Sequence, residues 1–362
     1  MGLLLPLKGK HYRIGRSLLN SIHLGLYKTK NKNIKIFVRD TSNVESITKA
    51  YYEFESLNID VILGPVFSNK VNELKSLLIS NNIPVITFSN NLDIAEKNIF
   101  ITGLTLKNEI ETIIHYASKK NHLEFAIIAP ENIYGNNIVR YFEQKSLDKN
   151  INVSSKVFYD SVAPDFYNVA KIISDYDKRK DNLIKKIDEL KDINSEDAKK
   201  EIKLLKRKDT YGSLNFDSLF IAVENFSQLS LLSSTLPYYD VDPKQIQYFG
   251  TSLWNKTAII KEPGLNNSIF VGLDKDKLNI FENLYSDFYN EVPHPISVFG
   301  FDAIGIVSSL TNQGIKINDT SITNKSGFNG LTGKFVFEND GTVNRELGLY
   351  RIKDEKITKI KY

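Results

Sequence analysis

Apolar and polar positions follow two different periods along the chain. Short apolar runs, such as residues 3–7 and 61–63, precede longer stretches in which apolar residues recur every three to four positions, as in residues 16–27. The short runs predict buried strands, and the longer stretches predict amphipathic helices. Strands without a polar face that alternate with helices indicate parallel sheets covered on both sides. The chain is therefore predicted to be an α/β protein.

This alternation continues through most of the 362 residues, a length that favours two domains. An Asp-Gly pair at Asp340-Gly341, between alternating apolar runs, predicts a late β-hairpin. The predicted strands are residues 3–7, 34–38, 61–63, 84–88, 125–129, 153–158, 218–223, 247–250 and 269–272. The predicted helices are residues 16–27, 43–57, 69–80, 109–119, 136–149, 226–236, 277–289 and 298–310.

A densely charged segment interrupts the pattern at about residues 177–209, where 12 Lys and Arg stand against 9 Asp and Glu. Narrow apolar stripes within it predict two helices, residues 178–192 and 195–208. Asn194-Ser195 followed by two acids is typical of a helix start. We expect an inserted helical hairpin, which is either a solvated structural spur or an arm that docks a partner.

Composition excludes several classes of site. The chain has no cysteine, so it has no disulfide, no thiolate metal site and no cysteine nucleophile. Its net charge of +4 is too small to indicate a nucleic-acid partner. No apolar run approaches the roughly 20 residues that span a bilayer, so no transmembrane segment is expected.

Motifs that carry chemistry are also missing from the sequence. It contains no phosphate-binding loop, no dinucleotide fingerprint and no nucleophile elbow, and none of its five histidines has metal-ligand spacing. We therefore predict a protein that is not an enzyme, without catalytic residues, metal or cofactor.

A row of small polar and aromatic residues follows the ends of predicted strands. In an open parallel sheet, ligands bind outside the carboxyl ends of the strands, where helix starts offer free N–H groups. These positions predict a ligand-binding cleft in which hydroxyl and N–H groups hold a carboxylate. The candidate residues are Phe67, Ser68, Ser89, Asn90, Tyr134, Glu224, Trp254 and Asp302.

Each of these candidates also has a structural interpretation. The two serines are suited to cap helices, and Glu224 faces solvent or caps the helix that follows it. Tyr134 and Trp254 are suited to packing, Trp254 between two lobes. Asp302 is then only an acid in the first turn of a helix.

Several segments resemble the branched-chain amino-acid-binding proteins, which have the type I periplasmic-binding-protein fold. The opening strand and glycines match that family, although Lys8 and Lys10 stand where its motif has Ser and Pro. The resemblance implies two Rossmann-like lobes joined by three crossovers, with residues 1–103 and 273–320 in lobe 1. Lobe 2 would comprise residues 104–272 and 321–362, with the hairpin inserted in it. The matching segments are residues 3–15, 60–65, 84–89, 134–135 and 300–303.

A second set of segments is similar to the alphaproteobacterial penicillin-binding protein activators of the same superfamily. These are relatives of an outer-membrane lipoprotein that stimulates class A peptidoglycan synthases, and they carry a charged helical insertion too. The most specific of the segments are Pro237-Tyr238-Tyr239-Asp240-Val241-Asp242-Pro243 and Gly250-Thr251-Ser252-Leu253-Trp254. The others are residues 65–68, 88–90 and 327–330.

The resemblance implies two alternative functions. The first is regulation of a class A penicillin-binding protein, in the periplasm, by a chain lipid-anchored through a leader missing from this numbering. The second is binding of amino acids for an ABC permease. In relatives that bind amino acids, the residues matching Ser68, Ser89 and Asn90 hold the α-carboxylate, and the match of Tyr134 closes over the ligand. Acceptors near Glu224 and Trp254 hold the ammonium group.

Overall fold

The structure is a computed structural model that describes residues 1–43, 45–78 and 83–361. It divides the chain into two compact units. Unit 1 consists of Met1–Asn108 and Leu273–Leu347, and unit 2 of Glu109–Gly272 and Gly348–Tyr362. The chain passes between the units three times, at 108/109, 272/273 and 347/348.

Unit 1 is built on a five-stranded parallel sheet in the order β2-β1-β3-β4-β5. Its central strands are buried on both faces, as their uninterrupted apolar sequences predict. Because all five strands run the same way, their carboxyl ends share one edge of the sheet. The strands are β1 (Gly2–Leu5), β2 (Phe37–Asp40), β3 (Ile62–Leu63), β4 (Val85–Thr87) and β5 (Ile99–Ile101).

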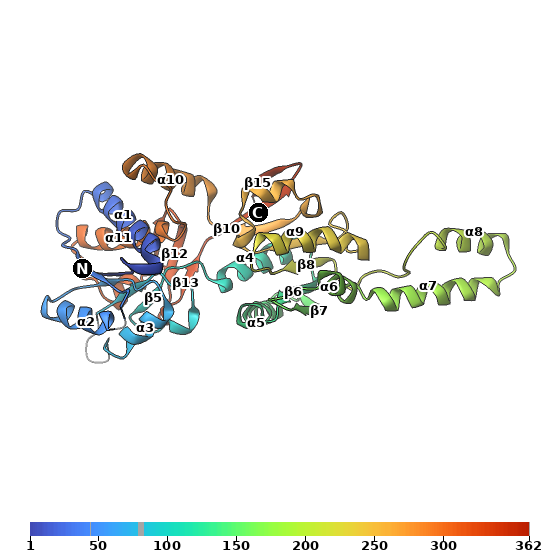
Figure 1. The fold of residues 1–362 in the computed structure, drawn as a ribbon, viewed down its shortest axis with the longest axis horizontal. Helices are drawn as coiled ribbons and strands as arrows, with labels where there is room; N and C mark the ends of the chain where they lie inside the picture. Colours follow the sequence, from blue (N-terminus) through green and yellow to red (C-terminus); the bar gives the residue numbers. More distant parts are fainter. Residues whose placement is uncertain (44, 79–82, 362) are drawn as a thin grey trace. The chain divides into compact units, whose positions relative to one another are not determined.

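Helices cover this sheet, and two of them pack very closely (Figure 1). A Cβ atom on Gly25 of α1 would lie 2.4 Å from Cγ2 of Ile304 in α11, so glycine lets the two helices approach. The helices of unit 1 are α1 (Tyr12–Thr29), α2 (Ser46–Ser56), α3 (Ser68–Lys75), α10 (Lys275–Tyr289), α11 (Ser297–Asn312) and α12 (Asp319–Ile322).

A small antiparallel sheet completes unit 1, with β12 (Gly333–Phe337) between β11 (Phe328–Gly330) and β13 (Val343–Arg345). Its β12–β13 turn confirms the hairpin predicted at Asp340-Gly341.

The division based on sequence placed residues 321–347 in the second lobe, whereas the structure places them in unit 1. The reason is a set of hydrogen bonds: Asp302 of α11 accepts from the amides of Leu331 and Thr332, at 2.8 and 2.9 Å. Residues 104–108, also assigned to the second lobe, lie in unit 1 as well.

Unit 2 is built on a seven-stranded sheet in the order β15-β14-β10-β9-β8-β6-β7. The five strands from β10 to β7 are parallel, β14 adds antiparallel to β10, and β15 adds antiparallel to β14. The strands are β6 (Glu124–Pro130), β7 (Asn152–Tyr159), β8 (Ser218–Ile221), β9 (Gln247–Gly250), β10 (Ile269–Gly272), β14 (Gly348–Lys353) and β15 (Lys356–Ile360).

The charged insertion is a helical hairpin of unit 2, as predicted (Figure 1). Ser195 caps the second helix by accepting from the amide of Ala198. Four apolar side chains between the two helices form a small core of their own, Leu183, Leu190, Ala198 and Leu205. The helices of unit 2 are α4 (Leu106–Lys119, which begins in unit 1), α5 (Ile133–Leu147), α6 (Phe166–Ile173), α7 (Tyr176–Lys191), α8 (Glu196–Leu205) and α9 (Phe226–Thr235).

Some of the observed elements differ from the predicted ones. Strand β5 and helix α6 were not predicted, although strand β4 and helix α3, which have the same lengths, were. The predicted helices 43–57 and 69–80 include residues 44 and 79–80, which lie outside the described residues. None of the described helices is long and apolar enough to cross a membrane.

Candidate functional site

Two candidate residues of unit 1 lie where β3 gives way to α3. Ser68 is the first residue of α3, and the residue in the capping position is Phe67, whose side chain makes no capping hydrogen bond. The phenyl ring of Phe67 lies 4.5 Å from the ring of His11, which follows β1. Ser68 is therefore not a helix cap, and its hydroxyl lies at a helix start, a position suited to an anion.

Ser89 and Asn90 follow β4 at the same edge of the sheet. Ser89 is buried, and its hydroxyl accepts a hydrogen bond from the amide of Asn91, whereas Asn90 is exposed. The carbonyl of Ser89 accepts from the amide of Gly103, and a Cβ atom on Gly103 would lie 2.5 Å from that oxygen. The backbone of Ser89 is thereby fixed against the segment that leads out of β5.

Asp302 is a buried residue in the second turn of α11, not at its start. Its carboxylate accepts from the amides of Leu331 and Thr332 and from the hydroxyl of Thr332. Burial raises its pKa, while these hydrogen bonds and the charge of Arg345 lower it. Both oxygens of Asp302 are therefore engaged inside unit 1, in holding the small antiparallel sheet to the helix.

In unit 2, Tyr134 and Glu224 lie at the carboxyl edge of the seven-stranded sheet. Tyr134 is in the first turn of α5, whose cap Asn132 accepts from the amide of Gly135. The same Asn132 donates to Oε1 of Glu224, over 2.7 Å. Asn132 was not among the sequence candidates, although its place two residues after a strand could have marked it.

Tyr134 is partly buried in a polar cluster. Burial, together with the charges of Glu109 and Glu224, raises its pKa to about 12, against the effect of a hydrogen bond with Thr251. Tyr159, at the end of β7, has its pKa raised by burial and by the charge of Glu224, and it donates to Oε1 of Gln228. Two tyrosine hydroxyls and two carboxylates are thus gathered at one edge of one sheet.

Glu109 is the residue of this cluster that sequence reasoning missed. It lies in the first turn of α4 and is 4% exposed. Its carboxylate accepts from the amide of Ser252, at 3.0 Å, and from the hydroxyl of Ser252, at 2.6 Å. Burial raises its pKa to about 7, against the effect of these hydrogen bonds. No sequence signal separates it from the other acids at helix starts, because its partner lies 143 residues away.

Trp254 is fully buried in the core of unit 2 itself. A Cβ atom on Gly250 would lie 2.0 Å from Cε2 of its indole, so the ring fills the space that the glycine leaves. The indole Nε1 is buried without a hydrogen-bond partner among the described residues. Packing within unit 2 accounts for this tryptophan.

Nothing in these clusters has the composition of a metal centre. Within residues 1–43, 45–78 and 83–361, no three His, Asp or Glu side chains are grouped so that they could hold a metal ion. The cluster of unit 2 offers hydroxyl and carboxylate oxygens beside a sheet edge, an arrangement that can bind polar groups.

Comparisons with known proteins extend these observations. An uncharacterized protein of Rickettsia prowazekii (strain Madrid E) is 26% identical over 160 residues, which are 44% of this chain and 43% of that protein. The chain therefore matches less than half the length of that relative.

Two solved structures are similar over 99% of both chains. A putative branched-chain amino acid ABC transporter from Rhodospirillum rubrum is 13% identical, with a TM-score of 0.77. The C-domain of LpoA (YraM) from Haemophilus influenzae, described as a regulator of PBP1A, is 16% identical, with a TM-score of 0.68. The predicted fold class, α/β of the type I periplasmic-binding-protein kind, is confirmed.

A family model also matches the chain. The match covers residues 1–247, which is more than half of the 362 residues, and the family is described as LppC putative lipoprotein. It agrees with the resemblance to penicillin-binding protein activators that the sequence motifs predicted. This chain belongs to the LppC putative lipoprotein family.

Proposed function

We propose that this chain is a non-catalytic periplasmic lipoprotein that regulates a class A penicillin-binding protein. The observation that carries the proposal is the family match over residues 1–247. The likeness to the C-domain of Haemophilus influenzae LpoA, a regulator of PBP1A, supports the choice of partner.

The state of the candidate site supports regulation over transport. Trp254 is fully buried in the core of unit 2, and Asp302 is engaged by the backbone of unit 1. Both oxygens of Glu109 accept from Ser252. A free amino acid would have to displace these internal contacts to use the same groups, and a buried polar group that loses its partner costs about 1–3 kcal/mol.

The direct test is a synthase assay. The purified chain is added to a class A penicillin-binding protein from the same organism, and glycan polymerisation and cross-linking are followed on a fluorescent lipid-linked precursor. We expect the rate to rise with the concentration of the chain and then saturate. Unchanged rates, with no complex of the two proteins in sedimentation, would refute the proposal.

A second candidate function is binding of amino acids for an ABC permease. It is favoured by the hydroxyl of Ser68 at a helix start and by Tyr134 at the carboxyl edge of the other sheet. If the chain is a transport protein, calorimetry with a panel of amino acids will show saturable binding of roughly micromolar affinity, about 8 kcal/mol. Ser68→Ala would then cost about 1.5–3 kcal/mol, because the lost hydrogen bond is to a charged group. We expect no such binding. The calorimetric titrations of Ser68→Ala and Ser89→Ala should therefore look the same as that of the parent.

The lipid anchor and the compartment are tested in cells. The native gene is expressed with a C-terminal tag, and lipid attachment is followed with a labelled fatty acid. We expect the label on the mature chain and the chain in the envelope fraction. An unlabelled protein in the cytosol would remove both candidate functions.

A further inference from the structure

Charge is unevenly distributed along the chain. Residues 1–39 hold nine of the 47 Lys and Arg and none of the 43 Asp and Glu. Four of the nine, up to Arg16, precede or begin α1, and four lysines follow near its end, at positions 28, 30, 32 and 35. Because an 18-residue helix is about 27 Å long, these are two separate groups.

Lys28 of the second group lies in the last turn of α1, and the other three lysines lie on the loop that follows, which is fixed to the core. Asn31 is 8% exposed and donates to Oγ1 of Thr311, at 2.7 Å, and to the carbonyl of Ser308. Its own Oδ1 accepts from the amide of Asn33. With Asn31 anchored inward, the lysines on either side of it are exposed. The backbone that carries Lys30 and Lys32 is therefore fixed to unit 1, while their side chains extend into solvent.

These lysines are not neutralised by acids. In the part of the chain that the structure describes, no ion pair joins Lys28, Lys30, Lys32 or Lys35 to a carboxylate. The carbonyl of Lys35 accepts from the amino group of Met1, so the first residue lies beside them.

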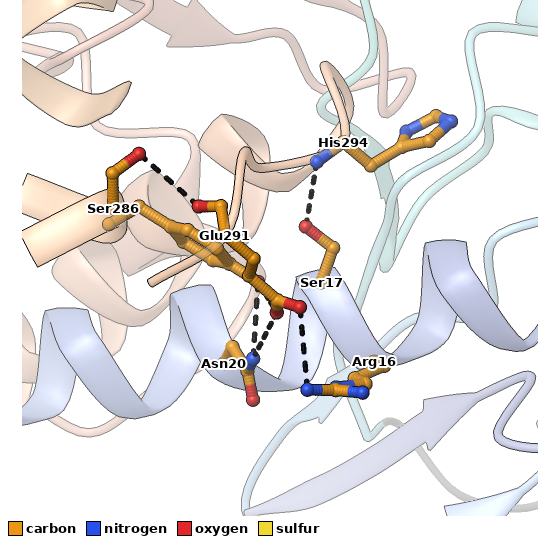
Figure 2. A network of polar contacts seen from close by, with 7 residues as sticks. Arg16, Ser17, Asn20, Ser286, Glu291 and His294 are labelled. Atoms are coloured by element: carbon orange, nitrogen blue, oxygen red, sulfur yellow. Dashed lines mark hydrogen bonds and ion pairs between the residues drawn. The ribbon is translucent and has the colours of Figure 1, made fainter. Parts of the chain in front are cut away.

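Two exposed aromatic rings adjoin the lysines. Tyr27 is 65% exposed and Phe288 is 48% exposed, and their ring centroids are 5.1 Å apart. Phe288 belongs to α10, which is tied to α1 by the network of Figure 2. In it, Glu291 pairs with Arg16 at 3.3 Å and accepts from Asn20 at 3.1 Å. Tyr27 directly precedes Lys28 in α1 and contacts Phe288, so both rings lie at the end of α1 from which the lysine-bearing loop leads.

We propose that this basic-aromatic surface, made of Tyr27, Lys28, Lys30, Lys32, Lys35 and Phe288, binds the headgroups of an anionic phospholipid membrane. Lysines on flexible stems attract a negatively charged bilayer, and exposed aromatic rings settle at the interface between headgroups and acyl chains. The proposal rests on the proposed function, because a periplasmic lipoprotein works beside a membrane. According to this proposal, the basic-aromatic surface of unit 1 faces that membrane.

Local acids are few. Asp60 acts on the amino group of Met1, and Asp287 precedes Phe288 in α10. Against them stand four lysines, and each basic residue near an anionic bilayer raises partitioning about fivefold. A position at the interface of a bilayer suits both the lysines and the exposed aromatic rings.

The experiment measures sedimentation of the full chain with vesicles of phosphatidylglycerol and phosphatidylcholine, and with vesicles of phosphatidylcholine alone. We expect binding to the anionic vesicles only, and its loss at about 0.5 M NaCl, where screening shortens electrostatic attraction to a few ångströms. The variant Lys28→Gln, Lys30→Gln, Lys32→Gln, Lys35→Gln should lose at least about a hundredfold in partitioning. The double variant Tyr27→Ala, Phe288→Ala should lose partitioning to the anionic vesicles by a smaller factor.

A matched control uses the hairpin of unit 2. Replacing Lys178, Lys180, Lys185 and Lys203 with Gln removes the same charge from four exposed positions, and it should leave vesicle binding unchanged. Thermal melting monitored by circular dichroism verifies that both variants fold. Equal binding to neutral vesicles, no binding to either, or an equal loss in the hairpin control would overturn the proposal.

The outcome is separable from that of the synthase assay. In detergent without vesicles, the four-lysine variant should stimulate the synthase as the parent does. If the parent does not bind vesicles and the variant does not stimulate the synthase, the surface contacts an acidic protein and the membrane proposal is refuted. If the parent binds vesicles and never stimulates, the membrane proposal stands and the proposed function is refuted.

Discussion

At the scale of single residues, Gly250 makes room for the only tryptophan of the chain. A methyl group at this position would collide with the indole of Trp254 in the core of unit 2, so Gly250→Ala forces the ring or the strand to move. Overpacking of this kind costs about 1–3 kcal/mol. We expect a lower melting temperature for Gly250→Ala in circular dichroism. As a control, Gly305→Ala meets no atom within 4 Å and lies in a helix, so it should melt at or above the temperature of the parent.

Glu109 should make stability depend on pH. Its pKa is raised from 4.5 to about 7 in the folded chain, so between these values the folded carboxyl holds a proton that the unfolded chain has lost. The contribution of Glu109 to stability is therefore highest below about pH 4.5, falls as pH rises through this window, and stays lowered above pH 7, by about 3 kcal/mol in all. Glu109→Gln keeps an acceptor for the amide of Ser252 and has no proton to lose.

The test compares melting temperatures of the parent and Glu109→Gln at pH 5 and pH 8. We expect the variant to gain relative to the parent at pH 8 and to match it more closely at pH 5. If the melting temperatures of the two proteins differ by the same amount at pH 5 and pH 8, the carboxyl of Glu109 does not titrate between these pH values.

Glu109 also shows what sequence reasoning could not find. Strand ends and helix starts are visible as local patterns, so Tyr134 and Ser89 could be placed at sheet edges from sequence alone. Burial of Glu109 depends on the loop after β9, and capture of Asp302 depends on the turn after β11. Such partners are brought together by tertiary folding, and the local pattern of apolar and polar residues does not indicate them.

At the scale of elements, the α7–α8 hairpin has its own small core and joins the rest of unit 2 at its base, which we call its root and which contains Arg179, Gly212 and Asp240. Arg179 is buried there and donates to the carbonyl of Gly212, at 3.1 Å, and pairs with Asp240 at 3.2 Å. Replacing residues 181–207 with a short Gly-Ser link keeps this root and removes a core of only four buried side chains. We expect cooperative melting within a few degrees of the parent, since a surface loop closes at small cost. Aggregation of the deletion would show that the hairpin supports the core.

The root itself should be more sensitive. Arg179→Ala leaves Asp240 without its cation and the carbonyl of Gly212 without its donor. Loss of a buried hydrogen-bonded charge costs more than loss of an exposed pair. We expect a larger fall in melting temperature for this single substitution than for the deletion. Lys199→Ala, which breaks an exposed ion pair within the hairpin, is the control and should change little.

The charged hairpin could be recognised because its apolar stripes are regular and its second helix starts with Ser195 and two acids. Strand β5 and helix α6 were missed, although strand β4 and helix α3, which have the same lengths, were predicted. Element length therefore does not account for the two omissions.

At the scale of the whole molecule, the assignment of residues 321–347 to unit 1 depends on buried charges. Asp302 holds the turn after β11, and Arg345 of β13 donates to the carbonyl of Thr102, at 2.9 Å. Both side chains are buried, and each affects the pKa of the other. The hydroxyl of Thr332 links the two, because it accepts from Arg345 and donates to Asp302. Removing one of two buried opposite charges leaves the other uncompensated, which is destabilising.

Asp302→Asn should therefore loosen the small sheet of unit 1 and leave unit 2 intact. We expect faster hydrogen exchange in peptides from residues 328–347, with exchange in β8 and β9 of unit 2 unchanged, because the hydrogen-bond partners of Asp302 belong to unit 1. The double variant Asp302→Asn, Arg345→Met removes both buried charges, so it should recover part of the protection that the single variant loses. Equal loss of protection in both units would instead mean that the two units unfold together and that residues 321–347 are not held to unit 1 by this pair.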